Sequence, residues 1–354
     1  MKFGISLGDL VGDKLTLHQD YIGVMSEVGL PWYNVMGNHD MNYDVQSDSL
    51  SDETFELNFG PNNYAFNYGN AHVIILDNII YPNPHTGKGY IGGFRKDQLD
   101  FVENNLKFVP KDKLIILAFH IPLFHNDPAA FRTSDRDRLF NLLSQYPNTV
   151  SLSAHTHYQQ HNFYSAKDGW KQEKPHHEYN VGTTSGDWYS GEFNHQNVPN
   201  STMRDGTPKG YAIMNVKGNT YSFDYKVAGE ASDYQIKLVV PSIVSVKHIH
   251  RYHLFANFFM GTPTDLVEYR IGNGEWMHMN HTPDVDPNYA YNLLKFDNSD
   301  AFIDARRPSN PVKSTHLWSI KLPKLKAGNH TLEVRATDIF GKTHYASKEI
   351  QVVK

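Results

Sequence analysis

The sequence contains no cysteine. This absence excludes disulfide bridges, thiolate nucleophiles, cysteine-ligated zinc and iron–sulfur clusters. The sequence also lacks any apolar run of about 18 residues, so no membrane-spanning segment is predicted. Basic residues are fewer than acidic residues, 33 against 38, and the net charge is −5. Because general nucleic-acid-binding proteins are usually basic, no nucleic-acid-binding surface is expected.

The sequence does contain enough apolar material for folded cores. Hydrophobic residues make up 40% of the 354 residues, and aromatic residues make up 13%. The length exceeds one average domain of about 100–200 residues, so two domains are expected. A small, polar stretch at residues 228–233 places the boundary between a first domain of residues 1–230 and a second domain of residues 234–354.

The two predicted domains differ in their hydrophobic patterns. In the first, strands alternate with helices, which is typical of a layered α/β domain. Its predicted strands are residues 3–7, 32–36, 64–68, 72–76, 114–119 and 149–153, and its predicted helices are residues 18–28, 96–106 and 135–145. The second shows strand patterns with no convincing helix, as in an antiparallel sandwich. Its predicted strands are residues 235–240, 253–259, 266–271, 317–322, 331–337 and 349–353.

Four short polar segments each follow a predicted strand of the first domain. They are Gly8-Asp9, Gly37-Asn38-His39-Asp40, His120-Ile121-Pro122 and His155-Thr156-His157. Because loops beyond the carboxyl ends of strands converge on one crevice in open α/β sheets, we expect these segments to meet in space. The converging side chains would be Asp9, Asn38, His39, His120, His155 and His157.

Each segment taken alone also has an ordinary structural explanation. An aspartate after a strand is usually a turn former, a His-x-His arises by chance, and His120 could be a packed core imidazole. The order of the segments and their shared position after strands favour one common site. Carboxylate, amide oxygen and neutral imidazole are ligands for Mn²⁺, Fe or Zn²⁺. Two such ions about 3.5–4 Å apart activate water and clamp a phosphoryl group.

The four segments resemble those of the calcineurin-like metallophosphoesterase family, with Ala154 in place of the family's usual glycine. The resemblance covers about residues 1–228. It is closest to bacterial members with a dedicated C-terminal β-rich domain, and residues 180–188 and 205–208 support that subgroup. This resemblance implies a four-layer αββα domain followed by an all-β, immunoglobulin-like sandwich.

The resemblance also implies a role for each candidate residue. Asp9 would bridge two metal ions. Asn38, His120 and His155 would complete one metal site, and His157 would serve the other. His39 would contact the phosphate and protonate the leaving oxygen, with Asp40 orienting its ring. Gly37 would relax the turn so that Asn38 and His39 both point inward.

One feature of the family pattern is missing. The family has an earlier Asp-x-His segment after a first strand, but only seven residues precede Gly8-Asp9 here. The resemblance therefore implies an N-terminally truncated chain without the first strand and helix, which binds about one metal ion and is impaired in activity. Asp13, His18 and His125 are candidate substitute ligands. A parent protein carrying the subgroup's export signal would be periplasmic or exported.

Weaker candidates lie outside these segments. Asp187 and Trp188 could line the substrate pocket, or belong to a structural loop with a half-buried tryptophan. His176-His177-Glu178 could be an extra metal site or the solvated start of a strand. Trp276 and Trp318 could form a glycan platform, although their strand spacing is typical of core residues. Purple acid phosphatases carry a tyrosine ligand three residues after the aspartate, where this chain has Gly12.

The expected function is hydrolysis of a phosphomonoester or phosphodiester by a metallophosphoesterase, with Mn, Fe, Zn or Co as the divalent ion. The alternative is a non-catalytic binding or structural protein with a degenerate metal site and a sandwich that binds a glycan or a protein. The missing Asp-x-His segment is the feature that separates the two hypotheses. The sequence does not predict which substrate or protein partner is bound.

Overall fold

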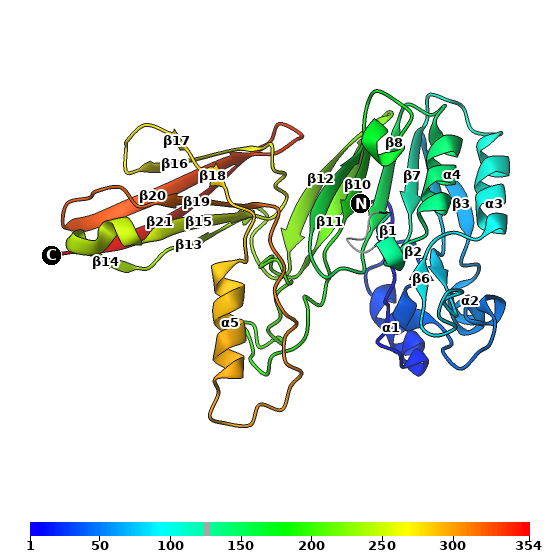
Figure 1. Cartoon of the computed structure of the whole chain (residues 1–354), viewed down its shortest axis with the longest axis horizontal. Helices are drawn as coiled ribbons and strands as arrows, with labels where there is room; N and C mark the ends of the chain where they lie inside the picture. The colour runs from blue at the N-terminus through cyan, green and yellow to red at the C-terminus, as the bar shows by residue number, and fades with distance from the viewer. Residues whose placement is uncertain (124–127) are drawn as a thin grey trace. The chain divides into compact units, whose positions relative to one another are not determined.

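The computed structural model describes residues 1–123 and 128–354 (Figure 1). The chain forms two compact units, and each unit consists of three separate stretches of the sequence. The first unit consists of residues 1–156, 162–180 and 216–221, and the second of residues 157–161, 181–215 and 222–354. The predicted fold class, a mixed α/β fold with a β-rich C-terminal region, is confirmed. The predicted domain boundary near residue 230 stays a prediction, and the structure groups residues 181–215 with the C-terminal unit.

The first unit is built on a six-stranded sheet in the order β3-β4-β7-β8-β10-β9. Strands β4, β7, β8 and β10 are parallel, and β3 pairs antiparallel with β4. The bounds are β3 Tyr64–Tyr68, β4 Ala71–Ile75, β7 Leu114–Ala118, β8 Thr149–Ser153, β9 Gln160–Tyr164 and β10 His176–Asn180. Two further strand pairs of this unit are β1 (Gly4–Ser6) with β2 (Trp32–Asn34) and β5 (Ile79–Ile80) with β6 (Ile91–Gly92). Strand β11 (Gly210–Lys217) pairs with β12 (Thr220–Val227), and residues 216–221 of this pair belong to the first unit and the rest to the second.

Helices α3 (Lys96–Leu106) and α4 (Thr133–Leu143) pack side by side on this sheet (Figure 1). The buried residues of α3, Leu99, Val102 and Leu106, are three and four positions apart, so they lie on one face of the helix. Ile115, Leu117 and Phe119 alternate along β7 and join the same core. The remaining β7 residues are also buried, as expected for a strand covered on both faces.

Helices α1 (His18–Ser26) and α2 (Glu53–Phe59) complete the first unit. We did not predict α2, which is only seven residues long and buries the single apolar residue Phe55. A stretch this short shows no helical repeat in the sequence. Across the described residues, no helix is both long and apolar enough to cross a membrane.

The second unit contains two sheets, with strand orders β13-β15-β19-β18 and β14-β21-β20-β16-β17. Their bounds are β13 Ile236–Val239, β14 Ile243–Ser245, β15 His253–Phe258, β16 Leu266–Ile271, β17 Met277–His278, β18 Asn280–His281, β19 Leu317–Lys321, β20 Gly328–Thr337 and β21 Thr343–Val353. Phe258 of the first sheet contacts His344 of the second, with ring centroids 5.4 Å apart. Trp318 is 1% exposed and belongs to this core, whereas Trp276 lies between Arg270 and Arg335.

The expectation that the C-terminal region contains no helix is wrong. Helix α5 (Pro287–Asp297) begins after Asp286, whose carboxylate accepts hydrogen bonds from the backbone N–H groups of Asn288 and Tyr289, both at 2.9 Å. An aspartate at the N-cap followed by proline in the first turn is a strong helix-start signal. The Asp-Pro pair was therefore available in the sequence.

The expectation that His176-His177-Glu178 is a solvated strand start is also wrong. The three residues are 1%, 5% and 0% exposed. They begin β10, which lies between β8 and β9 rather than at an edge of the sheet. Alternating polar residues normally indicate a solvated face, but here hydroxyl groups satisfy the rings: His176 contacts Thr149 and Ser151, and His177 contacts Tyr221.

Candidate metal centre

The candidate ligands of the first unit lie in four loops, each directly after a strand. Asp9 follows β1, Asn38 lies in a 3-10 turn (Asn38–Asp40) after β2, His120 follows β7 and His155 follows β8. The strands pair in parallel, β1 with β2 and β7 with β8, so each pair ends on the same side. The expected convergence of these loops therefore has a direct cause in the topology.

Three donor atoms from different loops surround Nε2 of His120. Oδ1 of Asn38 is 3.1 Å from it, Oδ2 of Asp9 is 3.2 Å away and Nδ1 of His155 is 3.2 Å away. The ligand atoms of Asp9, His120 and His155 all lie within 4.8 Å of one another. Donors about 3 Å apart are spaced as ligands are around one ion with bonds of about 2.1 Å. The donor set therefore fits a divalent metal ion.

The other ring nitrogen of His120 fixes the tautomer of this side chain. Nδ1 lies 2.7 Å from the backbone carbonyl oxygen of Leu7. A carbonyl oxygen only accepts hydrogen bonds, so Nδ1 carries the hydrogen and donates it. In the neutral imidazole the lone pair is then on Nε2, which faces the other donors. The ring is 1% exposed, so this orientation is held by the surrounding protein.

The backbone at the candidate ligands is strained. Asp9 and His155 have φ angles of 55° and 68°, and Asp13 and His157 have φ angles of 60° and 57°. Apart from these four, Asn197 is the single other described non-glycine residue with positive φ. The left-handed conformation costs about 1–3 kcal/mol at such residues and clusters at functional sites. The strain therefore marks these loops independently of the side-chain distances.

Gly37 allows two of the loops to approach closely. A Cβ atom at this position would lie 2.0 Å from the backbone nitrogen of Asp9 and 2.3 Å from its Oδ1. The φ of Gly37 is −107°, an extended conformation that other residues adopt. The expectation that Gly37 relaxes the turn is therefore wrong, because the glycine is needed for space.

Asp40 does not contact the ring of His39 among the described residues, contrary to expectation. Its buried carboxylate accepts hydrogen bonds from the backbone N–H groups of Leu10 and Gly37, both at 2.9 Å, and of Val11 at 3.2 Å. Asp40 therefore ties the Asp9 loop to the Asn38 loop. In the 3-10 turn the side chains of His39 and Asp40 point in different directions, which the sequence alone does not show.

Asp13 is instead the partner of His39. Its Oδ1 lies 2.7 Å from Nδ1 of His39, and its backbone N–H donates to the His39 carbonyl oxygen at 3.2 Å. The sequence suggested Asp13 only as a substitute ligand. Its position four residues after Asp9, in the same loop, was the available signal. The backbone N–H of His39 donates to Oδ1 of Asp9 at 3.0 Å, which joins this pair to the candidate metal ligands.

The electrostatics of the site favour a cation. Burial acts to raise the pKa of Asp9, but the charge and hydrogen bond of His120 and the His39 N–H outweigh it and hold that pKa well below its usual range. Burial acts to lower the pKa of His120, but the Asp9 carboxylate outweighs it and raises that pKa. The negative charge that attracts a proton to His120 also attracts a divalent ion.

Family models match both parts of the chain. The model for calcineurin-like phosphoesterase matches residues 3–159. The model for the C-terminal region of calcineurin-like phosphoesterase matches residues 178–344. The chain belongs to the calcineurin-like phosphoesterase family. A comparison with curated proteins found no match.

Two solved structures are similar to parts of this chain. A purple acid phosphatase from seeds of yellow lupin (Lupinus luteus) is 16% identical, with a TM-score of 0.47, over 64% of this chain and 44% of its own. CopC from Methylosinus trichosporium OB3b is 11% identical, with a TM-score of 0.19, over 33% of this chain and 92% of its own. The chain therefore spans less than half the length of the lupin protein.

In the second unit, His157 is paired with Asp187. Nδ1 of His157 lies 3.3 Å from Oδ1 of Asp187. The same carboxylate accepts hydrogen bonds from the Ser309 N–H at 2.7 Å, the Ser309 hydroxyl at 3.0 Å and the Tyr289 hydroxyl at 3.3 Å. Asp187 is 5% exposed. The expectation that Asp187 lines a substrate pocket is therefore wrong, because its oxygens are already used to orient His157.

Trp188 is half-buried, as in the structural alternative considered for this loop. The guanidinium of Arg306 lies 3.5 Å from the centre of its ring, and the His157 ring lies 5.8 Å from it. One face of the indole is thus covered by a cation. That face is not available for stacking on a sugar or base.

The two suggested substitute ligands that the structure describes, His18 and Asp13, do not join the group around His120. His18 is fully buried, with Nε2 3.5 Å from Asp40, which separates it from the ligand loops. Asp13 is occupied by His39. His125 lies outside the described residues.

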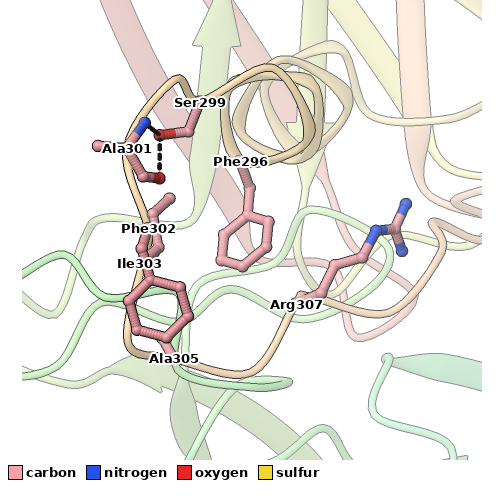
Figure 2. Close-up of a pocket in the computed structure, with 7 residues that line it drawn as sticks. All are labelled: Phe296, Ser299, Ala301, Phe302, Ile303, Ala305 and Arg307. Atoms are coloured by element: carbon pink, nitrogen blue, oxygen red, sulfur yellow. Dashed lines mark hydrogen bonds between the residues drawn. The ribbon is translucent and has the colours of Figure 1, made fainter.

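A pocket of about 350 Å³ lies beside the C-terminal end of α5 in the second unit (Figure 2). It is lined by Phe296, Ser299, Ala301, Phe302, Ile303, Ala305 and Arg307. The guanidinium of Arg307 is paired with Asp297 at 2.7 and 2.8 Å, so its charge is neutralised. None of the residues predicted to form the site lines this pocket.

Proposed function

We propose that this protein hydrolyses a phosphomonoester or phosphodiester at the group formed by Asp9, Asn38, His120 and His155. The observation that carries the proposal is the convergence of three donor atoms on Nε2 of His120, each within 3.2 Å. In this cluster Nδ1 of the buried His120 carries the hydrogen and Nε2 offers a lone pair, so the donors are suited to a cation. Family membership supports phosphoester hydrolysis.

The four side chains would hold the ion through Oδ2 of Asp9, Oδ1 of Asn38, Nε2 of His120 and Nδ1 of His155. When bound, such an ion lowers the pKa of water and neutralises phosphoryl oxygens. The donor set of oxygen and nitrogen suits Mn, Fe, Zn or Co. These donors make one site within the first unit, so we expect one tightly held ion per chain.

His39 would protonate the leaving oxygen. Oδ1 of Asp13 lies 2.7 Å from Nδ1 of His39 and orients the ring, which leaves Nε2 as the nitrogen that would exchange a proton with the substrate. The His39 ring is partly exposed, unlike that of His120, so a substrate can reach it. The backbone hydrogen bond to Asp9 holds the acid beside the ligand loop.

The test is hydrolysis of p-nitrophenyl phosphate and its bis ester with Mn²⁺, combined with calorimetric Mn²⁺ titration. We expect His39→Ala to lower turnover by about 10²- to 10⁴-fold and to leave Mn²⁺ affinity unchanged. We expect His155→Ala to weaken Mn²⁺ binding. His85→Ala removes an exposed histidine and should change neither quantity. Turnover unaffected by His39→Ala would count against the assigned acid, and a wild-type chain that binds no Mn²⁺ would count against the whole site.

A further inference from the structure

Asn78 binds the backbone beside the buried candidate ligand His120. It follows β4 in the chain and is fully buried. Its Oδ1 accepts hydrogen bonds from the backbone N–H groups of His120 at 3.1 Å and Ile121 at 2.9 Å. Its Nδ2 donates to the carbonyl oxygen of Ile121 at 2.7 Å. One side chain therefore satisfies three backbone groups of the turn that carries His120.

The topology explains why a side chain is needed here. Strands β4 and β7 pair as far as Ile75 and Ala118, and one further hydrogen bond joins the Leu76 N–H to the Ala118 carbonyl oxygen at 3.0 Å. Beyond this point β4 no longer supplies backbone partners to residues 120 and 121. Buried backbone N–H and C=O groups without hydrogen-bond partners destabilise the folded state. The side-chain amide of Asn78 has one N–H donor side and one C=O acceptor, as a peptide group does. It therefore supplies the hydrogen bonds to residues 120 and 121 that the β4 backbone would otherwise make.

The position of Asn78 is itself fixed. The Gly93 N–H donates to the Asn78 carbonyl oxygen at 3.0 Å, next to the short pair β5 and β6. Asn78 therefore links the β5–β6 pair to the turn after β7. A surface loop could not hold a ligand backbone in this way, because its own position would vary.

His120 is consequently held at three points. Leu7 fixes the ring through Nδ1, and the Ala154 N–H donates to the His120 carbonyl oxygen at 2.9 Å. Asn78 fixes the His120 N–H and the following peptide. We propose that Asn78 is a positioning residue for the metal site, which holds Nε2 of His120 at the distance from Asp9, Asn38 and His155 that one divalent ion requires. This inference rests on the proposed function, since it concerns the same site.

The experiment compares Mn²⁺ affinity by calorimetry in the full chain with Asn78→Leu and Asn78→Asp. Leucine has a similar size but no polar atoms, whereas aspartate keeps the acceptor and loses the amide donor. We expect Asn78→Leu to raise the Mn²⁺ dissociation constant by about 10- to 100-fold, the range typical of residues that orient metal ligands. We expect Asn78→Asp to have a smaller effect in the same direction, because one of its three hydrogen bonds is lost.

A matched control separates positioning from general loss of stability. Thr149→Val removes one buried hydrogen bond, the 2.8 Å contact with His176, at the end of β8 opposite to His155. It should lower the unfolding temperature without changing the Mn²⁺ dissociation constant. A merely structural role for Asn78 would give its variants the same behaviour as Thr149→Val.

The outcomes distinguish this inference from the function on which it rests. Folded Asn78→Leu or Asn78→Asp protein with wild-type Mn²⁺ affinity would overturn the positioning role alone. If Asn78→Leu does not fold, Asn78→Asp decides: weakened Mn²⁺ binding supports the role, and unchanged binding overturns it. Wild-type protein that binds no Mn²⁺, or His120→Ala protein that binds it as tightly as wild type, would overturn the proposed function and this inference together.

Discussion

The two units each bury a histidine beside an aspartate, and the difference between the pairs separates a candidate site from a structural network. In the first unit, Nε2 of His120 lies 3.2 Å from Asp9. In the second, Nε2 of His316 lies 2.9 Å from Asp205. Both histidines are 1% exposed. Proximity and burial alone therefore do not identify a functional pair.

The surroundings of the two pairs are not alike. Asp205 also accepts hydrogen bonds from the Thr207 and Gln159 N–H groups, and Nδ1 of His316 lies 2.8 Å from Oδ1 of Asn257. This network joins residues 181–215 to the β-rich sheets by individually matched hydrogen bonds. Around His120, by contrast, three ligand atoms lie within 3.2 Å of the same nitrogen, Nε2. Two of them belong to Asp9 and His155, whose backbones are strained. An excess of lone pairs facing one point is the feature that indicates a cation.

The strongest test of this comparison is His120→Ala. The substitution removes the nitrogen around which the other ligands are arranged, so we expect Mn²⁺ affinity and Mn²⁺-dependent turnover to fall by at least about 100-fold. Calorimetric titration and hydrolysis of the bis-p-nitrophenyl ester measure the two effects. His72→Ala is the matched control, since His72 is a 3% exposed histidine bonded to Asn67 and Asn105. Equal effects of the two substitutions would contradict the distinction.

The reciprocal substitution, His316→Ala, should leave metal binding intact and lower stability. It removes one partner of a buried pair and leaves the Asp205 carboxylate without its imidazole. We expect the free energy of unfolding to fall by about 3–5 kcal/mol. Denaturant unfolding followed by circular dichroism measures this loss, with Mn²⁺ titration of the folded variant as the control. Loss of Mn²⁺ binding in folded His316→Ala protein would show that the second network also serves the site.

Glu178 is a fully buried carboxylate without an imidazole partner among the described residues, and it sharpens the comparison. Its partners are the hydroxyls of Ser153 at 2.6 Å and Tyr164 at 2.8 Å and the Leu123 N–H at 3.3 Å. Burial outweighs these hydrogen bonds and raises the pKa of Glu178 to about 7. Beside a histidine, the pKa values of Asp9 and Asp205 are lowered despite burial.

This difference predicts a pH dependence of stability. The unfolded chain ionises Glu178 near pH 4.5, whereas the folded chain keeps its proton to about pH 7. Between these values the folded state binds more protons, so the Glu178 contribution to the free energy of unfolding falls as pH rises, by about 3 kcal/mol in total. His176 and His177, whose pKa values burial lowers to about 3, give the opposite slope below pH 6.5. The difference between wild type and Glu178→Gln isolates the Glu178 contribution, and a constant difference from pH 4.5 to 7 would contradict it.

Sequence reasoning found the parts of the molecule that depend on local periodicity. The bounds of α3 and β8 match their predictions, because helical spacing and a short buried run are read within one element. The meeting of the Asp9, Asn38, His120 and His155 loops also follows from the sequence, since parallel strands end on the same side. Whether these four residues bind metal stays a prediction.

The remaining features depend on contacts between distant residues. Asn78 and His120 are 42 positions apart, and no periodic signal links a buried amide to a turn after another strand. The burial of Glu178 results from the position of β10 within the sheet, which its polar sequence conceals. The exchange of Asp40 for Asp13 as the partner of His39 depends on the direction of one 3-10 turn. Such features are set by tertiary structure rather than by local propensity.

The pair of His39 and Asp13 gives the smallest expected effect, because it is the most exposed of the histidine–carboxylate pairs at the site. The side chain of Asp13 is 61% exposed, so solvent weakens its interaction with the His39 ring. A hydrogen bond to a charged group contributes about 1.5 kcal/mol at the lower end of its range, which corresponds to roughly tenfold in rate. We therefore expect Asp13→Asn to lower Mn²⁺-dependent turnover about tenfold without changing Mn²⁺ affinity. Asp20→Asn, which removes the same charge from the exposed start of α1, should leave turnover unchanged. A weakened Mn²⁺ affinity in Asp13→Asn would instead place Asp13 among the metal ligands. It would contradict the assignment of Asp13 to the acid His39 rather than to the metal site.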